Sequence, residues 1–272
     1  MKNYSIIVFA PHPDDEALGC AGLIYKAIQK NEKVKVVVIA NGESSMDGTE
    51  WFYGRKPTIQ DFINIGYVRQ KESISAMKVL GLGSDDVIFL GYPNDGLLKI
   101  ISSDVYTKNN PYKSEFTNFD RVSYENSHTM GAPFCKESLS GDIKAIIGDC
   151  KPSYVYVTHP LDSHLDHRAC GQIVYKIAKS FDKSTTVFCY MIAKSKIPSP
   201  KRRFVYKCIG QLKEKYLDDG TKKIKKRCIH EYKSQSFLFE ALAHHNEVER
   251  FWKLEHGIRA KIAKRFIPSL RY

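Results

Sequence analysis

Short apolar runs of strand type alternate with segments of helical spacing along residues 5–192, and this alternation constrains the fold of the chain most. The first run, residues 5–10, is β-branched and continuously apolar, which is typical of a strand buried on both faces of a parallel sheet. Strands that alternate with helices indicate βαβ units with right-handed crossovers. We therefore expect an α/β fold, with a predominantly parallel sheet and helices on both faces. The expected strands are 5–10, 34–40, 86–90, 153–158 and 185–192, and the expected helices are 17–30, 68–80, 137–150 and 167–180.

Two long polar segments, residues 42–66 and 99–135, interrupt the alternation. Loops of this length inside a compact domain usually carry function or lack order, and the aromatic side chains here favour loops that pack over a site. A Lys-rich connection follows at 194–229, and a helical pattern resumes at about residues 231–248. We expect an α/β domain over residues 1–193, with 42–66 and 99–135 as substrate loops. We expect residues 194–272 to form a basic C-terminal segment that packs on the same domain.

The formal net charge of +12 is concentrated in that C-terminal segment. Residues 194–272 carry 21 Lys and Arg against 8 Asp and Glu, whereas residues 1–193 are nearly balanced. A basic segment of this kind indicates an acidic partner. Three interpretations stay open: a solvated face without a partner, contact with an anionic membrane, and contact with a phosphate-bearing substrate. Nucleic acid would give the same charge signal, but no recognition motif supports it.

Cysteine spacing and the chain start bear on the compartment. The seven cysteines are odd in number and lack Cys-x-x-Cys spacing, which argues against a disulfide framework or a structural zinc knuckle. The longest apolar run, residues 6–10, is far too short to span a bilayer, and the start lacks the pattern of a signal peptide. We expect a cytoplasmic protein with reduced thiols; placement at a membrane periphery is the alternative that the basic segment leaves open.

A run of chemically active residues, Pro11-His12-Pro13-Asp14-Asp15-Glu16, follows directly on the first expected strand. Ligands of parallel α/β sheets bind at the carboxyl ends of the strands. The imidazole of His12 and the carboxylate of Asp15 are both suitable ligands for Zn²⁺. The alternative is structural, because Asp14 and Asp15 stand where carboxylates cap the positive end of the following helix.

A second cluster, residues 159–167, follows the fourth expected strand and should reach the same edge of the sheet. A third ligand from this cluster would complete two imidazoles and one carboxylate, a catalytic zinc set that leaves a position for water. Bound zinc lowers the pKa of water and polarises a carbonyl. A single His or Asp at a strand end is more often a cap or a surface residue. Two clusters on one edge make coincidence a poor explanation.

These residues resemble the PIG-L/LmbE family of N-acetylglucosaminyl deacetylases. Pro-His-Pro-Asp-Asp-Glu after an N-terminal strand is similar to the first motif of the family, and His164-Leu165-Asp166-His167 is similar to the second. Weaker similarities lie at Arg69-Gln70-Lys71-Glu72, at Leu90-Gly91-Tyr92-Pro93-Asn94-Asp95-Gly96 with Asn94 inserted, and at Tyr232-Lys233-Ser234-Gln235. The resemblance covers about residues 4–98, 137–192 and 228–243, and it implies a Rossmann-like (LmbE-like) fold.

The resemblance also implies roles for individual residues, and one Zn²⁺ per chain. His12, Asp15 and His167 match the zinc ligands, and Asp14 matches the general base that activates the zinc-bound water. His164 matches the histidine that stabilises the oxyanion or protonates the leaving amine, and Asp166 would orient a neighbouring histidine. Arg69 and Asp95 match positions that contact the sugar. Glu16 either caps the helix or braces the ligands, and His159 either lines the pocket or has a core or capping role.

The expected function is zinc-dependent hydrolysis of the N-acetyl amide of an amino sugar or its conjugate, which releases acetate and a free amine. Such an enzyme is a hydrolase of carbon–nitrogen bonds other than peptide bonds. Its expected partner is a small amino-sugar conjugate, and a homo-oligomer is compatible with the sequence. Two alternatives stay open: a zinc amidase acting on a non-sugar or thiol-conjugate amide, and a degenerate hydrolase scaffold that binds acidic polymers or a membrane through its basic tail.

Overall fold

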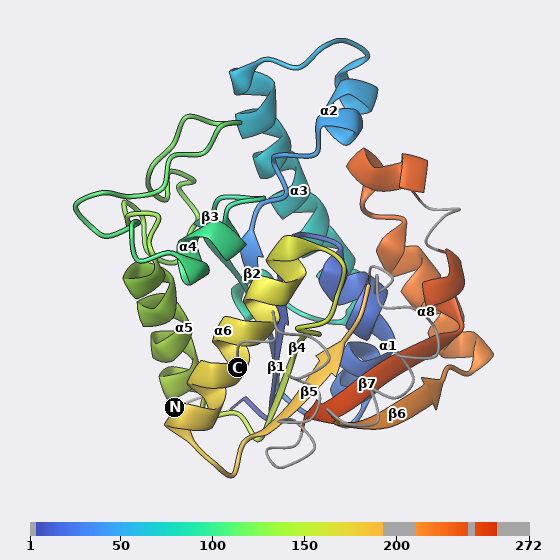
Figure 1. Ribbon diagram of the computed structural model, residues 1–272. Helices are drawn as coiled ribbons and strands as arrows, with labels where there is room; N and C mark the ends of the chain where they lie inside the picture. The colour runs from blue at the N-terminus through green and yellow to red at the C-terminus, as the bar shows by residue number, and fades with distance from the viewer. Residues whose placement is uncertain (1–3, 193–209, 239–242, 255–272) are drawn as a thin grey trace, which may run out of the picture.

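A computed structural model describes residues 4–192, 210–238 and 243–254. A seven-stranded sheet in the order β3-β2-β1-β4-β5-β7-β6 forms its centre (Figure 1). The strands are β1 (Ile6–Ala10), β2 (Val34–Ala40), β3 (Val87–Tyr92), β4 (Tyr154–Thr158), β5 (Thr186–Tyr190), β6 (Gly210–Tyr216) and β7 (Val248–Leu254). The first five strands run parallel, and β7 pairs antiparallel with both β5 and β6.

Helices cover both faces of the sheet, as expected (Figure 1). One face packs against α4 (Leu97–Ser102), α5 (Lys136–Cys150) and α6 (Leu165–Phe181). The other face packs against α1 (Asp15–Gln29), α3 (Ile59–Leu80) and α8 (Asp219–Ile229). Side chains of β1 alternate between the two cores, because successive residues of a strand point to opposite faces. Ile7 and Phe9 belong to the first core, and Ile6 and Val8 to the second.

The two long interruptions have different structures. The segment 42–66 contains α2 (Met46–Tyr53) and the beginning of α3. The segment 99–135 contains the end of α4 and is otherwise irregular, yet it is packed into the molecule. Its residues Tyr112 and Tyr124 are 7% and 2% exposed, and His128 donates its backbone N–H to the carbonyl of Phe89 in β3. That these segments select the substrate stays a prediction.

The C-terminal segment is the part where the expected secondary structure was wrong. Instead of one helix over 231–248, the structure has the 3₁₀ turns η2 (Lys233–Leu238) and η3 (Ala243–Asn246), followed by strand β7. The Lys-rich connection contains β6 and α8, which begins at the side-chain cap of Asp218 on the N–H of Thr221. Two strands that are distant in sequence therefore extend the sheet, since β7 pairs antiparallel with both β5 and β6. Among the described residues, no helix combines the length and the apolar composition needed to cross a membrane.

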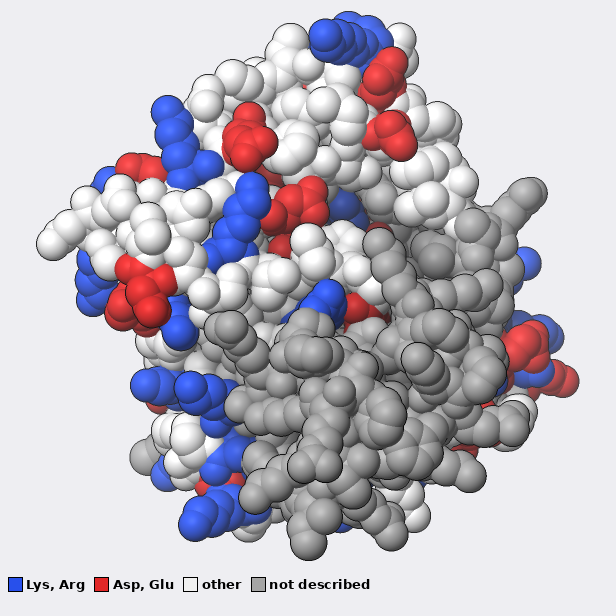
Figure 2. All heavy atoms as spheres, in the orientation of Figure 1, with Lys and Arg blue, Asp and Glu red and all other residues white. Residues whose placement is uncertain are grey.

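Charged side chains are distributed unevenly over the face shown in Figure 2. A group of acidic side chains near the centre lies beside Lys and Arg side chains, and further groups of both signs lie around the periphery. The basic run in α8 is only partly available to a partner, because Lys225 is fully buried and Lys222 lies 2.7 Å from the carboxylate of Glu247. The charge run was thus not a purely solvated face.

Candidate metal centre

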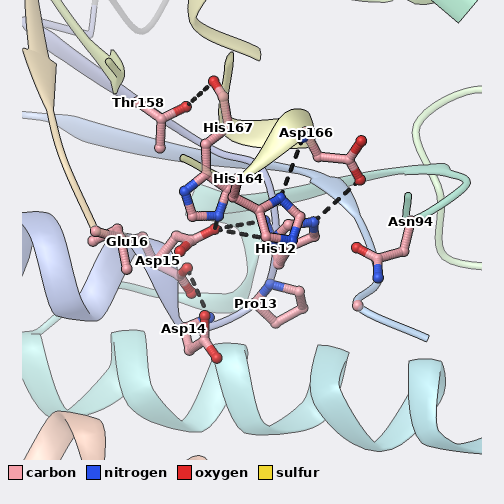
Figure 3. A network of polar contacts seen from close by, with 12 residues as sticks. His12, Pro13, Asp14, Asp15, Glu16, Asn94, Thr158, His164, Asp166 and His167 are labelled. Atoms are coloured by element: carbon pink, nitrogen blue, oxygen red, sulfur yellow. Dashed lines mark hydrogen bonds and ion pairs between the residues drawn. The ribbon is translucent and has the colours of Figure 1, made fainter. Parts of the chain in front are cut away.

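The two motifs meet between β1 and β4, where the order in which successive strands are added to the sheet reverses. β1 and β4 are parallel neighbours, and residues 12–16 and 159–167 follow their carboxyl ends. From β1 the chain winds outward through β2 to β3, and it then returns to the other side of β1 with β4. Such a switch point is where α/β sheets bind ligands. Figure 3 shows the side chains from both motifs pointing toward one another.

The two expected histidine ligands both lie close to one carboxylate oxygen of the third expected ligand, Asp15. Oδ2 of Asp15 lies 3.3 Å from Nδ1 of His12 and 3.2 Å from Nε2 of His167, and all three side chains are at most 9% exposed. The same oxygen accepts the backbone N–H of His12 at 3.1 Å. Zinc ligands lie about 2.0–2.2 Å from a tetrahedral ion, so ligand atoms lie about 3.3 Å from one another. The two spacings to Asp15 fit zinc ligands, and a second possible set of ligands comprises His12, His164 and His167.

The imidazoles of His12 and His167 each have a second carboxylate close to the ring nitrogen that faces away from Asp15. Nε2 of His12 lies 3.4 Å from Oδ2 of Asp166, and Nδ1 of His167 lies 3.3 Å from Oδ2 of Asp162. Histidines that bind metals usually present their second nitrogen to such a partner, which fixes the ring and its tautomer. The role of Asp162 was not expected from the sequence, although this residue lies in the second cluster, residues 159–167. The arrangement of two braced imidazoles around a carboxylate fits a divalent metal ion.

Backbone contacts hold the two bracing carboxylates in place. Asp162 accepts the N–H groups of His164 and Ile192, both at 3.0 Å. Asp166 accepts the N–H groups of Asp95 and Leu97 at 2.5 and 3.1 Å. Asp166 thereby ties the turn after β3 to the beginning of α6.

The electrostatics of the site favour positive charge. Burial alone would lower the pKa of His12, but the carboxylates of Asp15 and Asp166 outweigh it and raise this pKa to about 9. The pKa of His167 is raised well above its ordinary value because Asp15 and Asp162 outweigh burial in the same way. The pKa of Asp15 is lowered, since the two histidines outweigh its burial. A bound divalent cation would supply the positive charge that these groups attract.

His164 lies on the exposed side of the site. Its side chain is 38% exposed, and its ring stacks on that of His167 with 4.6 Å between centroids. Nδ1 accepts the backbone N–H of Asp166, so the neutral ring carries its proton on Nε2. Burial, together with the neighbouring His12 and His167, lowers the pKa of His164 to about 4. His164 thus presents a neutral N–H donor. One nitrogen of each of the three imidazoles lies within 4.8 Å of the others, so His164 is an alternative metal ligand.

Asp14 occupies a left-handed backbone conformation, with φ 116°. Its side chain is 16% exposed, and Oδ2 lies 2.9 Å from Nη2 of Arg69. Burial raises the pKa of the Asp14 carboxyl, and the guanidinium of Arg69 acts in the opposite direction. A carboxylate at the edge of the site with a raised pKa is suited to accept a proton near neutral pH.

The two expected sugar contacts have different surroundings. Asp95 has a half-exposed side chain, and its Oδ1 lies 3.9 Å from Nε2 of His164. Arg69 is 4% exposed, and it donates to the backbone carbonyl groups of Gly42 and Pro13 as well as to Asp14. A Cβ atom on Gly42 would lie 2.2 Å from Nη1 of Arg69, so this glycine makes room for the guanidinium. Contact with a sugar stays a prediction for both residues, and Asp95 is the more accessible.

The two residues with open roles lie behind the site. Glu16 is fully buried, and its carboxylate accepts the backbone N–H of Asp14 at 3.1 Å, which favours a bracing role. His159 is also fully buried; its Nδ1 accepts the N–H of Leu161 and its ring packs against Trp252. His159 therefore belongs to the turn and the core and does not line the exposed side.

Comparisons with known proteins identify the family of the chain. Residues 7–178 match the family described as PIG-L, GlcNAc-PI de-N-acetylase. A relative from Bacillus subtilis (strain 168), the probable N-acetyl-alpha-D-glucosaminyl L-malate deacetylase 2, is 26% identical over 200 residues, which cover 72% of this chain and 71% of the relative.

Two solved structures share the fold. A deacetylase of the teicoplanin biosynthesis pathway, in complex with teicoplanin, has a TM-score of 0.62 at 15% identity, covering 93% of this chain and 98% of that chain. The N,N'-diacetylchitobiose deacetylase from Pyrococcus horikoshii, in complex with an inhibitor, has a TM-score of 0.58 at 14% identity, covering 90% of this chain and 82% of that chain.

Proposed function

The chain belongs to the PIG-L family, and from this premise we propose that it is a zinc-dependent N-deacetylase of an amino sugar or its conjugate. One observation carries the proposal: His12 and His167 face the same oxygen of Asp15, and each has a carboxylate behind it. Asp14, which adjoins Asp15 in the chain, has a side chain that is 16% exposed, and that of His164 is 38% exposed. A metal-ion donor set with a separate base and hydrogen-bond donor is what amide hydrolysis requires.

His12, Asp15 and His167 would hold the zinc ion. When bound, zinc supplies a Lewis acid that polarises the amide carbonyl and lowers the pKa of water at the site toward ~7. Two imidazoles with one carboxylate are typical of catalytic zinc, because three protein ligands leave a position for water or substrate. Asp166 and Asp162 keep the two rings in the orientation and tautomer that this requires.

Asp14 accepts a proton from the attacking water while the oxygen of the water bonds to the carbonyl carbon. The N–H of His164 at Nε2 donates to the carbonyl oxygen as negative charge develops there. The bond between carbon and nitrogen then breaks, and the proton taken by Asp14 passes to the leaving nitrogen. The products are acetate and a free amine.

The names of the relatives support an N-acetylglucosamine unit as the substrate. The Bacillus subtilis relative is named for N-acetyl-alpha-D-glucosaminyl L-malate, and the Pyrococcus horikoshii enzyme for N,N'-diacetylchitobiose. Polar side chains beside the imidazoles agree with a sugar: Asn94 lies there in Figure 3, and Ser44 contacts both Asn94 and Asp95. An apolar wall would have favoured the amidase of a non-sugar substrate.

Acetate release from N-acetylglucosaminyl malate and N,N'-diacetylchitobiose tests the proposal. We expect activity that a chelator abolishes and added Zn²⁺ restores, and we expect Asp14→Asn to bind zinc but to lose activity by ~10²–10⁴-fold. Asp142→Asn is the matched control, because this buried carboxylate lies on α5 and bonds to Tyr92 and Thr129. Full activity of Asp14→Asn would refute its role as the base. Absence of zinc binding with salt-sensitive binding of a polyanion would favour the degenerate scaffold.

Several expectations about the surroundings of the enzyme stay predictions. They are the contact of residues 194–272 with an anionic membrane or a phosphate group, a homo-oligomeric state, and a cytoplasmic location. The division into residues 1–193 and 194–272 is likewise a prediction; β6 and β7 of the second part join the sheet of the first through the pairing of β7 with β5.

A further inference from the structure

We propose that Tyr232 is a positioning residue for Asp14, and that it acts through the carboxylate of Glu16. The inference rests on the proposed function, because it concerns the residue that we assign as the base. Tyr232 lies 216 positions after Glu16 in the sequence, in the turn between α8 and η2. The C-terminal segment would thereby contribute to the geometry of a site built from residues 12–167.

The backbone of Asp14 needs support from outside its own turn. Its φ of 116° lies in a region that residues with a side chain rarely adopt, and such conformations persist only where the surroundings determine them. Released from its contacts, this peptide would relax toward an ordinary conformation. The direction of the Asp14 carboxylate would then change, because the side chain follows its own backbone.

Contacts on two sides hold this peptide. On one side, Nη2 of Arg69 donates to the carbonyl oxygen of Pro13 at 2.6 Å and to Oδ2 of Asp14 at 2.9 Å. On the other side, Oε2 of Glu16 accepts the N–H of Asp14 at 3.1 Å. Arg69 therefore fixes the carboxylate and the preceding carbonyl, and Glu16 fixes the N–H between them.

Glu16 can hold Asp14 only if its own carboxylate cannot rotate. Its second oxygen, Oε1, accepts the hydroxyl of Tyr232 at 2.5 Å and that of Ser73 at 2.6 Å. Both donors meet the same oxygen, so they keep Oε2 turned toward Asp14. Glu16 and Ser73 are fully buried and Tyr232 is 1% exposed, so water does not replace a lost hydroxyl there.

The segment that carries Tyr232 is itself attached to α3. Ser234 donates both its N–H and its hydroxyl to the carboxylate of Glu72, at 2.8 and 2.6 Å. Glu72 lies one turn of α3 after Arg69, which holds the opposite side of Asp14. Arg69 and the segment that carries Tyr232 are therefore both attached to α3. This shared attachment would keep the distance between the two contacts of Asp14 constant. This accounts for the distant Tyr232-Lys233-Ser234-Gln235 motif, which the proposed chemistry does not use.

The variant Tyr232→Phe removes one hydroxyl and tests the inference on the full-length zinc-loaded protein. We expect kcat to fall at least ~10-fold, because displaced catalytic groups cost up to ~10²-fold, while KM and zinc content stay unchanged. Tyr4→Phe is the matched control, since the Tyr4 hydroxyl also donates to a carboxylate, that of Asp86 at 3.0 Å. This contact lies at the amino ends of β1 and β3, whereas the site lies at the carboxyl ends of the strands. Ser73→Ala removes the second donor to the same oxygen and should act in the same direction as Tyr232→Phe.

Exchange of the Asp14 amide hydrogen, followed by NMR, decides the inference without any assay of activity. We expect this amide to exchange ~10-fold faster in Tyr232→Phe than in the wild type, and at the wild-type rate in Tyr4→Phe. Unchanged exchange in Tyr232→Phe, or a fall in zinc content that accounts for the lost kcat, would overturn the positioning role. A wild-type protein without deacetylase activity would refute the proposed function instead, and the amide exchange would still report whether Tyr232 positions Asp14.

Discussion

The buried ion pair between Lys225 and Glu249 provides a quantitative test of how the C-terminal segment joins the rest of the protein. The Nζ and Oε1 atoms lie 2.8 Å apart, and neither side chain is exposed. Both partners also reach α1, because Lys225 donates to the carbonyl of Leu18 and Glu249 accepts the N–H groups of Gly22 and Leu23. The pair therefore connects α8, β7 and α1.

Replacing Lys225 by Met keeps an unbranched side chain that is one atom shorter, and it removes the charge. At an effective dielectric constant of ~20, attraction over this distance is worth about 6 kcal/mol, and part of it offsets the desolvation of the two ions. Removal of one partner leaves the carboxylate of Glu249 buried without a cation, which typically costs ~3–5 kcal/mol. Since domains are commonly stable by ~5–15 kcal/mol, this is a large fraction of the total.

Urea unfolding of Lys225→Met, Glu249→Gln and the double variant measures the effect. We expect each single variant to lose ~3–5 kcal/mol and the double variant to lose less than their sum, because its second substitution removes the unpaired charge. A loss below ~1 kcal/mol in Lys225→Met would refute the reasoning from burial. Two separate unfolding transitions in the wild type would refute the expectation that residues 194–272 pack on the same domain.

Three further outcomes are expected. Asp166→Asn should weaken zinc binding ~10–100-fold in competition with a chelator, and unchanged affinity would contradict its place behind a ligand. Gly171→Ala should lower stability by ~1–3 kcal/mol in thermal melts, because its Cβ would lie 2.3 Å from the carbonyl oxygen of Thr158, whereas Gly141→Ala, with open space at its Cβ, should not destabilise. Zinc at 100 times its Kd should stabilise the protein by ~2.7 kcal/mol, and a melting temperature that zinc leaves unchanged would argue against a zinc site.

The sheet and the convergence of the two motifs were predictable because their signals are local. An apolar run such as Ile6–Ala10 indicates a strand without knowledge of its neighbours, and a parallel sheet brings the ends of its strands to one edge. His12 and His167 therefore had to approach one another once both preceding strands were identified. The distances confirm that they do.

The C-terminal structure was not predictable in the same way, because its signals are non-local. β7 is held by β5 and β6, and nothing within residues 248–254 indicates which strand will accept it. α8 is rich in Lys and looked like a connection. The buried residues of α8, among them Lys225 and Cys228, recur at helical spacing. Because one of them is a lysine, the sequence does not show the apolar periodicity that would indicate a helix.

The roles of individual polar residues depended on partners that the sequence does not identify. Arg69 was expected beside a sugar and is found packed against Asp14, Pro13 and Gly42. Asp162 is about as close to His167 as Asp166 is to His12. From the sequence, however, an orienting role was expected only for Asp166. Spacing along the chain predicts which groups gather, and only the fold determines which atom each one faces.

The position of the site between β1 and β4 has a consequence for the order of folding. His12 and Asp15 are near neighbours in sequence, but Asp166 lies 154 positions from His12. Closing so long a loop costs entropy that short-range contacts do not repay, so the pairing of β1 with β4 is expected late in folding. During refolding, tight capture of zinc would therefore mark the moment at which the two halves of the sheet join, and it would select the chains that have completed this step.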